Sequence, residues 1–335
     1  MNMKKWMEQI QAEKVKKPLP ILAFPCVQLM GITVKQLIAD GKLQAQGMKE
    51  VAQRTDSLAA VSFMDLSLEA EAFGADIKTS DMEVPTVIGT LIKDMKAAEK
   101  LEVPSLEAGR IGLCLEGVNR AKALIQDRPV FAGIIGPFSL TGRLVDVNRA
   151  FLYCKKQPQL LHTVLRKAAD FLIDYANAYK AAGADGIVMA EPLAGMLSPK
   201  LAQGFSEPYV KEIAGAVKDD DFLVIYHNCG NAALKMASSI MRIGCDAYHF
   251  GNAIDMASML ELFPEDTLVM GNIDPAGQFT NGTPESMREA VLALMEGCSK
   301  YPNFIPSSGC DIPPAAKWEN IDAFFQAVKD YYEGN

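Results

Sequence analysis

The sequence has few histidines and fewer basic than acidic residues. Only 3 of its 335 residues are His, and 33 Lys and Arg against 41 Asp and Glu give a net charge of -8. Because an acidic protein does not attract the phosphates of nucleic acid or an anionic membrane at long range, we expect neither as a partner. The first 20 residues scatter their charges and contain no uninterrupted apolar run, so we expect no signal peptide or membrane anchor, and a cytoplasmic protein.

Several common motifs are also missing. Neither GxGxxG nor GxxxxGK occurs, which argues against a glycine-rich phosphate loop. No Pro/Gly/Ser-rich linker divides the chain, so we expect a single domain over residues 1–335. The 7 cysteines are an odd number in a chain without a secretion signal, so a disulfide framework is not expected. With 49% hydrophobic residues, the chain has enough apolar material for one large core.

Short β-rich runs recur along the chain, and most are followed by a longer pattern with helical spacing. This alternation is typical of βα units around a parallel sheet, and eight such units in a chain of this length predict an α/β fold of the (β/α)8 TIM barrel type. Residues 66–128 are long for one crossover, so we expect an elaborated insertion near the barrel mouth. The predicted strands are 20–24, 59–64, 129–135, 185–190, 222–227, 246–250, 267–271 and 303–307.

Potential metal ligands follow two of these strands. In a (β/α)8 barrel the active site is built from the carboxyl ends of the strands and the loops after them. His227 and Cys229 are two residues apart in an extended segment, so both side chains point the same way, and Cys310 follows the last strand at the same opening. One imidazole and two thiolates suit zinc and leave a fourth position for substrate. A half-buried, hydrogen-bonded His and Cys pair without metal is the alternative.

Other polar residues lie at the same predicted opening. Asp65 and Glu191 are candidate catalytic carboxylates, although Asp65 also fits a helix N-cap. Glu71 is a candidate fourth metal ligand, with a surface salt bridge as the alternative. Asn252 and Asn272 each follow a glycine and are candidates for substrate binding, which simple turn formation also explains. Ser139 is a further substrate-binding candidate; no histidine lies near it in the sequence, so a catalytic triad is not supported.

Five motifs together resemble the uroporphyrinogen decarboxylase superfamily. Within it the chain looks like the methylcobamide:coenzyme M methyltransferase branch, and the resemblance covers nearly the whole chain. The family fold is a (β/α)8 barrel, in agreement with the strand count. The motifs are YHNCGN at 226–231, GNIDP at 271–275, SSGCDIPPAA at 307–316, MDLSLEAEAFG at 64–74 and LSPK at 197–200.

The resemblance implies a zinc-dependent methyl transfer. It makes His227, Cys229 and Cys310 ligands of Zn2+, which binds a substrate thiol as a thiolate. The thiolate then takes a methyl group from a methylated corrinoid supplied by a corrinoid-binding partner protein. Coenzyme M is the implied acceptor, but other small acceptors or donors and the opposite direction of transfer stay open.

Two alternatives from other classes stay open as well. The first is a decarboxylase acting on a porphyrinogen, because Asp65 matches the catalytic aspartate of that branch. However, decarboxylases of this family resemble one another in an arginine-rich N-terminal segment, and the first arginine here is Arg54. The second is a docking module for a corrinoid protein, with a zinc site but no turnover.

Overall fold

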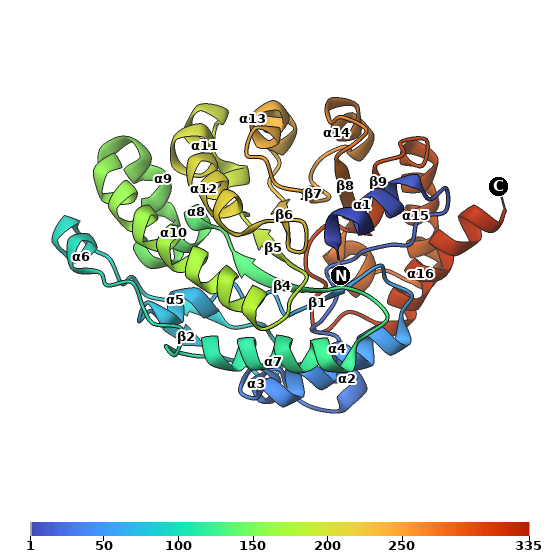
Figure 1. The fold of residues 1–335 in the computed structure, drawn as a ribbon, viewed down its shortest axis with the longest axis horizontal. Helices are drawn as coiled ribbons and strands as arrows, with labels where there is room; N and C mark the ends of the chain where they lie inside the picture. The colour runs from blue at the N-terminus through green and yellow to red at the C-terminus, as the bar shows by residue number, and fades with distance from the viewer. Residues whose placement is uncertain (1, 335) are drawn as a thin grey trace.

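A curled parallel sheet forms the centre of the molecule. The computed structural model describes residues 2–334. Seven parallel strands follow one another around the sheet in chain order, and helices surround them (Figure 1). This arrangement confirms the predicted α/β class and the (β/α)8 type of barrel. The strands are β1 (Ala60–Val61), β4 (Val130–Ile135), β5 (Gly186–Ala190), β6 (Leu223–Asn228), β7 (Ala247–Phe250), β8 (Leu268–Ile273) and β9 (Phe304–Ser308).

The barrel strands are buried on both faces. Every residue of β4, β5, β6, β7 and β9 is buried. One face of each strand packs against the outer helices and the other fills the barrel interior, which is why their sequences are apolar runs rather than alternating patterns.

The eighth position of the barrel is built differently from the prediction. Residues 20–24, predicted as the first strand, lie in an irregular segment. Leu19 N donates to Pro306 O of β9 at 3.0 Å, and Pro18 O accepts from Leu58 N, just before β1, at 2.9 Å. The segment therefore closes the gap between β1 and β9. Pro18 and Pro20 have no amide hydrogen, so a regular ladder of hydrogen bonds cannot form there.

The N-terminal helix covers one end of the barrel. In α1 (Met3–Ala12) the amide of Met3 donates to Asp220 O, just before β6, at 2.8 Å. The ring of Trp6 lies 6.0 Å from that of Phe131, and Ile10 belongs to the apolar cluster inside the barrel. Because α1 covers the end where the strands begin, the carboxyl ends of the strands form the opposite, functional end.

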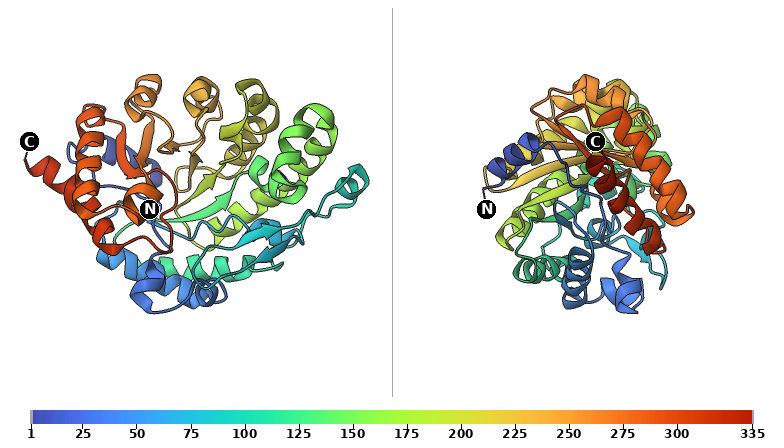
Figure 2. Two further views of the ribbon diagram at one scale, coloured as in Figure 1. Left: turned by 180° about the vertical axis from the view of Figure 1, so that it is seen from behind. Right: turned by 90° about the vertical axis from the view of Figure 1, so that its right-hand side faces the viewer.

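The remaining helices form the outer layer of the barrel (Figure 2). The main packing pairs are α4 (Gly41–Arg54) with α7 (Ile111–Leu124), α10 (Pro158–Ala181) with α12 (Glu207–Val217) and α15 (Pro284–Cys298) with α16 (Trp318–Glu333). The long helix α10 begins at Pro158, because a proline suits the first turn of a helix. These helices are α2 (Cys26–Met30), α3 (Val34–Ile38), α4 (Gly41–Arg54), α8 (Pro137–Val145), α9 (Val147–Lys156), α10 (Pro158–Ala181), α11 (Pro199–Phe205), α12 (Glu207–Val217), α13 (Ala237–Met241), α14 (Met256–Leu262), α15 (Pro284–Cys298) and α16 (Trp318–Glu333), with short turns η1 (Ala194–Met196), η2 (Ala233–Met236) and η3 (Pro275–Thr280).

Residues 66–128 contain more structure than one crossover helix. They form α5 (Leu68–Ala72), the antiparallel hairpin of β2 (Asp76–Lys78) and β3 (Thr86–Ile88), α6 (Met95–Lys100) and α7 (Ile111–Leu124). In Figure 1, α6 lies at the outer edge of the molecule. Lys167 of α10 donates to Ala98 O at 2.9 Å and to Leu101 O at 2.6 Å, which holds α6 against the outer layer.

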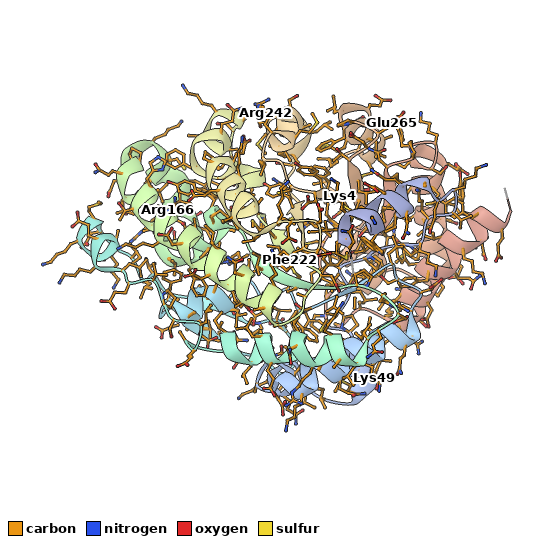
Figure 3. The ribbon with its side chains drawn as sticks, viewed as in Figure 1. Lys4, Lys49, Arg166, Phe222, Arg242 and Glu265 are labelled. Carbon is orange, nitrogen blue, oxygen red and sulfur yellow. The ribbon has the colours of Figure 1, made fainter. Side chains whose placement is uncertain are left out.

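The outer surface carries many charged side chains. Lys49, Arg166 and Arg242, labelled in Figure 3, lie on the outer helices or at their ends. Across residues 2–334, no helix combines the length and the apolar character needed to span a bilayer.

Candidate metal centre

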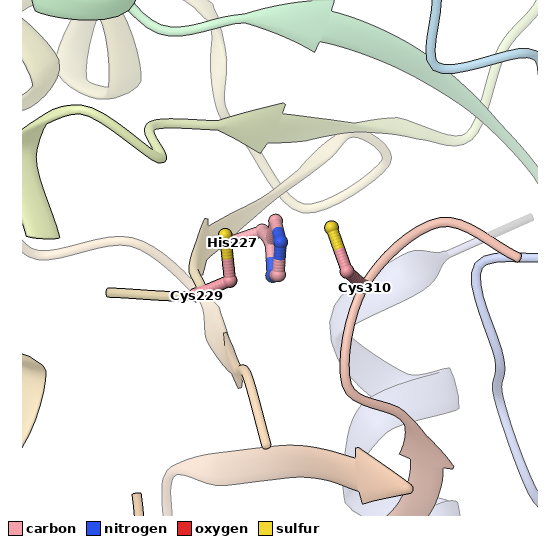
Figure 4. A group of neighbouring side chains, drawn as sticks. All are labelled: His227, Cys229 and Cys310. Atoms are coloured by element: carbon pink, nitrogen blue, oxygen red, sulfur yellow. The ribbon is translucent and has the colours of Figure 1, made fainter. Parts of the chain in front are cut away.

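Three side chains with metal-binding atoms converge at the carboxyl end of the barrel. His227 lies in β6, Cys229 directly follows that strand, and Cys310 lies two residues beyond β9. One ligand atom from each lies within 4.8 Å of the other two (Figure 4). Because β7 and β8 separate β6 from β9 in the sheet, only the curvature of the sheet brings Cys310 to the other two residues.

Glycines allow the loops around this site to pack closely. A Cβ on Gly251, after β7, would lie 2.6 Å from the Cα of Cys229, and a Cβ on Gly309 would lie 2.7 Å from Oδ1 of Asn252. Distances this short leave no room for a side chain, so glycine is required at both positions. Close packing at these two glycines therefore helps to hold both cysteine loops in place.

The two thiols shift the pKa of each other. A hydrogen bond from Cys310 lowers the pKa of the Cys229 thiol, and the neighbouring His227 lowers it further. The same hydrogen bond, together with burial, raises the pKa of Cys310. A cation bound there would compete with the protons of both thiols.

His227 is connected to the barrel interior through its other ring nitrogen. Its Nδ1 lies 2.7 Å from Nδ1 of His249, the residue opposite it on β7. Nε2 of His249 lies 2.8 Å from Oγ of Ser307, whose hydroxyl donates to Leu19 O at 2.7 Å. Burial lowers the pKa of His249 well below its usual value, so this ring is neutral. Nε2 of His227 is buried and has no hydrogen-bond partner.

The three donors fit a zinc ion. A buried ring nitrogen without a partner is unusual, and coordination to a cation would satisfy it. Zinc is bound by imidazole nitrogen and cysteine sulfur in a tetrahedron, and a site with three protein ligands keeps one position for substrate. His227, Cys229 and Cys310 are the residues that would hold it.

Glu71 lies outside this group of three within the described part of the chain. Its Oε2 accepts from Nε of Arg110 at 2.7 Å, and Nη1 of the same arginine donates to Oδ2 of Asp65 at 2.6 Å. Oδ1 of Asp65 accepts from the amide and hydroxyl of Ser67 at 3.0 and 2.6 Å, just before α5. One guanidinium thus pairs with both carboxylates. The N-cap of α5 is Ser67 rather than Asp65, because the helix begins at Leu68 and not at Leu66, so the helix N-cap reading of Asp65 is wrong.

Glu191 and Ser139 are buried together at the start of α8. The carboxylate of Glu191 accepts from the amides of Phe138 and Ser139 at 2.6 and 3.0 Å, and from the Ser139 hydroxyl at 2.5 Å. Ser139 Oγ in turn accepts from Leu193 N at 3.1 Å. Burial raises the pKa of Glu191 to about 7. In this structure the carboxylate of Glu191 satisfies two free amides of the first turn of α8.

The two asparagines differ in their surroundings. Nδ2 of Asn272 donates to Gly251 O at 3.0 Å and to Ile254 O at 2.9 Å, which holds the loop after β7. Asn252 is exposed and lies against Gly309, next to Cys310. Asn252 is therefore free to contact a substrate, whereas the amide nitrogen of Asn272 is occupied by the backbone.

Sequence reasoning missed Arg110 and Glu69. Arg110 lies in the long insertion, and no local pattern indicates that it contacts two carboxylates about 40 residues earlier. Glu69 is almost fully buried; its Oε1 accepts from Ile135 N at 2.9 Å, and its Oε2 has no partner. Burial raises the pKa of Glu69 to about 8. The spacing of Glu69 and Glu71 could have indicated that one of them is buried when the other faces the mouth, because residues two apart in a helix point in different directions.

The sequence of this barrel matches a known protein family. The family model described as uroporphyrinogen decarboxylase (URO-D) matches residues 21–331, so the chain belongs to the uroporphyrinogen decarboxylase family, as the motifs predicted.

Relatives within the family include methyltransferases and decarboxylases. The methylcobamide:CoM methyltransferase MtbA of Methanosarcina acetivorans is 30% identical over 80% of this chain and 78% of its own length. That of Methanosarcina mazei is 28% identical over 94% and 95%. The uroporphyrinogen decarboxylase of Psychromonas ingrahamii is 29% identical over 83% of this chain and 80% of its own length.

Solved structures agree on the fold. A methyltransferase from Methanosarcina mazei has a TM-score of 0.86 and 23% identity, covering 99% of this chain and 98% of its own. A B12-independent methionine synthase from Shewanella has a TM-score of 0.62 and 14% identity, covering 95% and 96%.

Proposed function

We propose that the protein is a zinc-dependent methyltransferase that moves a methyl group between a corrinoid carried by a partner protein and a small thiol. The names of the methylcobamide:CoM methyltransferase relatives support a corrinoid-dependent methyltransferase. The observation that carries the zinc proposal is the convergence of His227, Cys229 and Cys310, with Nε2 of His227 buried and unpartnered.

The proposed reaction exchanges one bond for another. In the direction of thiol methylation, a sulfur–carbon bond forms, the cobalt–carbon bond breaks, and the electron pair of that bond stays on cobalt. The thiol must lose its proton first, because a thiolate is the effective nucleophile. Zinc bound at this site would supply that deprotonation by stabilising the thiolate form of the substrate.

The residues of the chain would prepare this step. His227 would present a neutral nitrogen, and Cys229 and Cys310 two sulfur donors, so the protein ligands carry negative charge and keep a bound substrate sulfur electron-rich. Asn252, exposed beside Cys310, would contact the substrate or the corrinoid. Glu71 as a fourth ligand in the absence of thiol stays a prediction, and it would require the carboxylate to rearrange around Arg110.

The test is methyl transfer from methylcobalamin to a panel of thiols, followed by loss of the methyl–cobalt absorbance. We expect turnover with at least one thiol, coenzyme M included, by the zinc-loaded protein, and none by the protein with serine at 229 and 310. Zinc binding without turnover on any thiol or methylated donor would instead support the docking module.

The decarboxylase alternative has one residue in its favour. Asp65 lies buried at the mouth end, but it is paired with Arg110 and Ser67. Decarboxylation needs no metal, so it leaves the three-ligand group unexplained. Activity on a porphyrinogen by zinc-free protein would establish the decarboxylase and contradict the proposal.

A further inference from the structure

A row of hydrogen-bonding groups runs from the candidate metal centre into the barrel wall. It consists of His227, His249, Ser307 and the carbonyl of Leu19, joined at 2.7, 2.8 and 2.7 Å. His227, His249 and Ser307 are all at most 1% exposed, so no bulk water competes for these contacts. The direction of the protons along this row determines which nitrogen of His227 is free to bind a metal.

The carbonyl end fixes that direction. A carbonyl oxygen only accepts, so the hydroxyl hydrogen of Ser307 is committed to Leu19 O. Ser307 Oγ therefore accepts from His249, whose Nε2 must carry a hydrogen. Among the described residues no carboxylate forms a hydrogen bond or ion pair with the buried ring of His249, so nothing would balance a second proton and the ring is neutral. A neutral imidazole has one donor and one acceptor nitrogen, so Nδ1 of His249 is a lone pair.

The lone pair of His249 in turn sets the state of His227. Two unprotonated nitrogens facing each other at 2.7 Å would repel, so Nδ1 of His227 must carry the hydrogen between them. The other nitrogen of His227, Nε2, is then an unprotonated lone pair, and it is the buried atom without a partner beside the two sulfurs.

We infer that His249 and Ser307 are positioning residues that hold His227 in the Nδ1–H tautomer and so keep Nε2 ready to bind the metal. This inference deepens the proposed function and rests on its metal site. Ligating histidines commonly donate their second ring nitrogen to a neighbouring group, and loss of that neighbour typically reduces metal affinity about 10–100-fold.

Two substitutions of His249 distinguish its role as a hydrogen-bond acceptor for His227 from its role in filling space. Phenylalanine fills the space but offers no acceptor to His227, so we expect His249→Phe to bind zinc about 10–100-fold more weakly in competition with a chelator. Asparagine places an oxygen near the position of Nδ1, so His249→Asn should bind zinc more tightly than His249→Phe.

Substitutions of the two adjacent serines provide a matched pair. Ser307→Ala removes the acceptor of His249 and should also weaken zinc binding. Ser308→Ala removes a neighbouring buried hydroxyl that accepts from Ile21 N at 3.1 Å and lies outside the row, so its zinc affinity should match the wild type. Both alanines remove one buried hydroxyl, so a general loss of stability would affect them equally.

The tautomer itself is measurable, because the chain has only 3 histidines. Nitrogen-15 NMR of the zinc-free protein should show His227 as Nδ1–H and His249 as Nε2–H. His162, on α10 and hydrogen-bonded to Tyr209 instead, is the internal reference and should not change in any variant.

Two results would overturn the inference: His227 as the Nε2–H tautomer in the zinc-free wild type, or His249→Phe and Ser307→Ala both binding zinc as tightly as Ser308→Ala. Neither readout uses methyl transfer. A protein with the expected tautomers and affinities but no transferase activity would refute the proposed function and leave this inference standing.

Discussion

Gly195, after β5, and Gly230, after β6, lie against each other without room for a side chain on either. A Cβ on Gly195 would lie 2.5 Å from the Cα of Gly230, and a Cβ on Gly230 would lie 2.2 Å from the Cα of Gly195. Because Gly230 directly follows Cys229, this contact fixes the loop that carries one of the two sulfurs.

Replacing Gly230 with alanine should therefore disturb the metal site. The added methyl group must displace backbone, which typically costs about 1–3 kcal/mol, and the displaced loop carries Cys229 away from His227. We expect Gly230→Ala to lower zinc affinity at least about tenfold in chelator competition.

Gly215 in α12 supplies the control for that substitution. Apart from its chain neighbours and the backbone of its own helix, no described atom lies within 4 Å of a Cβ placed there. Gly215→Ala should leave zinc affinity unchanged and raise stability by up to about 1 kcal/mol, because alanine is the better helix former. Unchanged zinc binding in Gly230→Ala would show that the glycine contact does not hold the site.

Removal of either sulfur should remove the metal. Cys229→Ser and Cys310→Ser each leave two strong zinc ligands, so purified protein that has not been treated with chelator should fall from about one zinc per chain to well below stoichiometry. Elemental analysis measures this directly. Cys154→Ser is the control, because that thiol lies in α9 and donates only to Ala150 O. Equal zinc content in all three variants would contradict the three-ligand site.

Arg110 should be essential for the stability of the barrel mouth. Its side chain is 13% exposed and that of Asp65 is 4% exposed, so Arg110→Ala leaves a buried carboxylate unpaired. Breaking a buried pair in this way typically costs about 3–5 kcal/mol, measured by urea unfolding.

Arg120 lies in α7, the helix that begins directly after Arg110, and gives the matched comparison. It pairs with Glu116 one turn earlier, and both side chains are more than one-third exposed. Arg120→Ala should change stability by less than about 0.5 kcal/mol. If the two alanine variants unfold at the same urea concentration, the pairing of Arg110 with Asp65 and Glu71 does not stabilise the fold.

Glu69 should make stability depend on pH. Burial raises its pKa in the folded protein to about 8, against an ordinary value of 4.5. The folded state thus keeps a proton that the unfolded chain releases, so its contribution to stability is complete below pH 4.5 and is lost as pH rises to about 8. Within that window the free energy of unfolding should fall by up to about 1.4 kcal/mol per pH unit because of this group.

Glu69→Gln should lack this dependence, because an amide does not ionise. Urea unfolding between pH 5 and pH 8 should show the variant gaining on the wild type as pH rises. Glu107→Gln, at an exposed carboxylate, should follow the wild-type profile. Parallel profiles for wild type and Glu69→Gln would mean that Glu69 is not protonated in the fold.

The barrel strands and their ends could be predicted from local sequence, with one exception. Buried parallel strands are apolar on both faces, so runs such as 129–135 and 222–227 stand out, and the polar residues after them mark the mouth. Residues 20–24 have the same apolar character but form no strand, because prolines at 18 and 20 remove two backbone donors. Apolar pattern reports burial, and it does not report whether the backbone completes a ladder.

The contacts of the three carboxylates could not be predicted from the sequence in the same way. Asp65, Glu71 and Glu191 follow or lie near strand ends, as expected, yet their contacts are Arg110 for the first two and the start of α8 for the third. Those partners come from other segments of the chain, and no spacing rule connects them.

The sequence by itself determined the barrel class, the family, and the pairing of His227 with Cys229 two residues later, because periodicity and short spacing act within one strand. The barrel class also predicted Cys310 at the same opening. Only the tertiary structure decided that Arg110 binds two carboxylates, and that His249 and Ser307 form hydrogen bonds behind the ring of His227. These contacts join segments that are far apart in the chain, so they depend on how the curled sheet brings distant residues to the same end of the barrel.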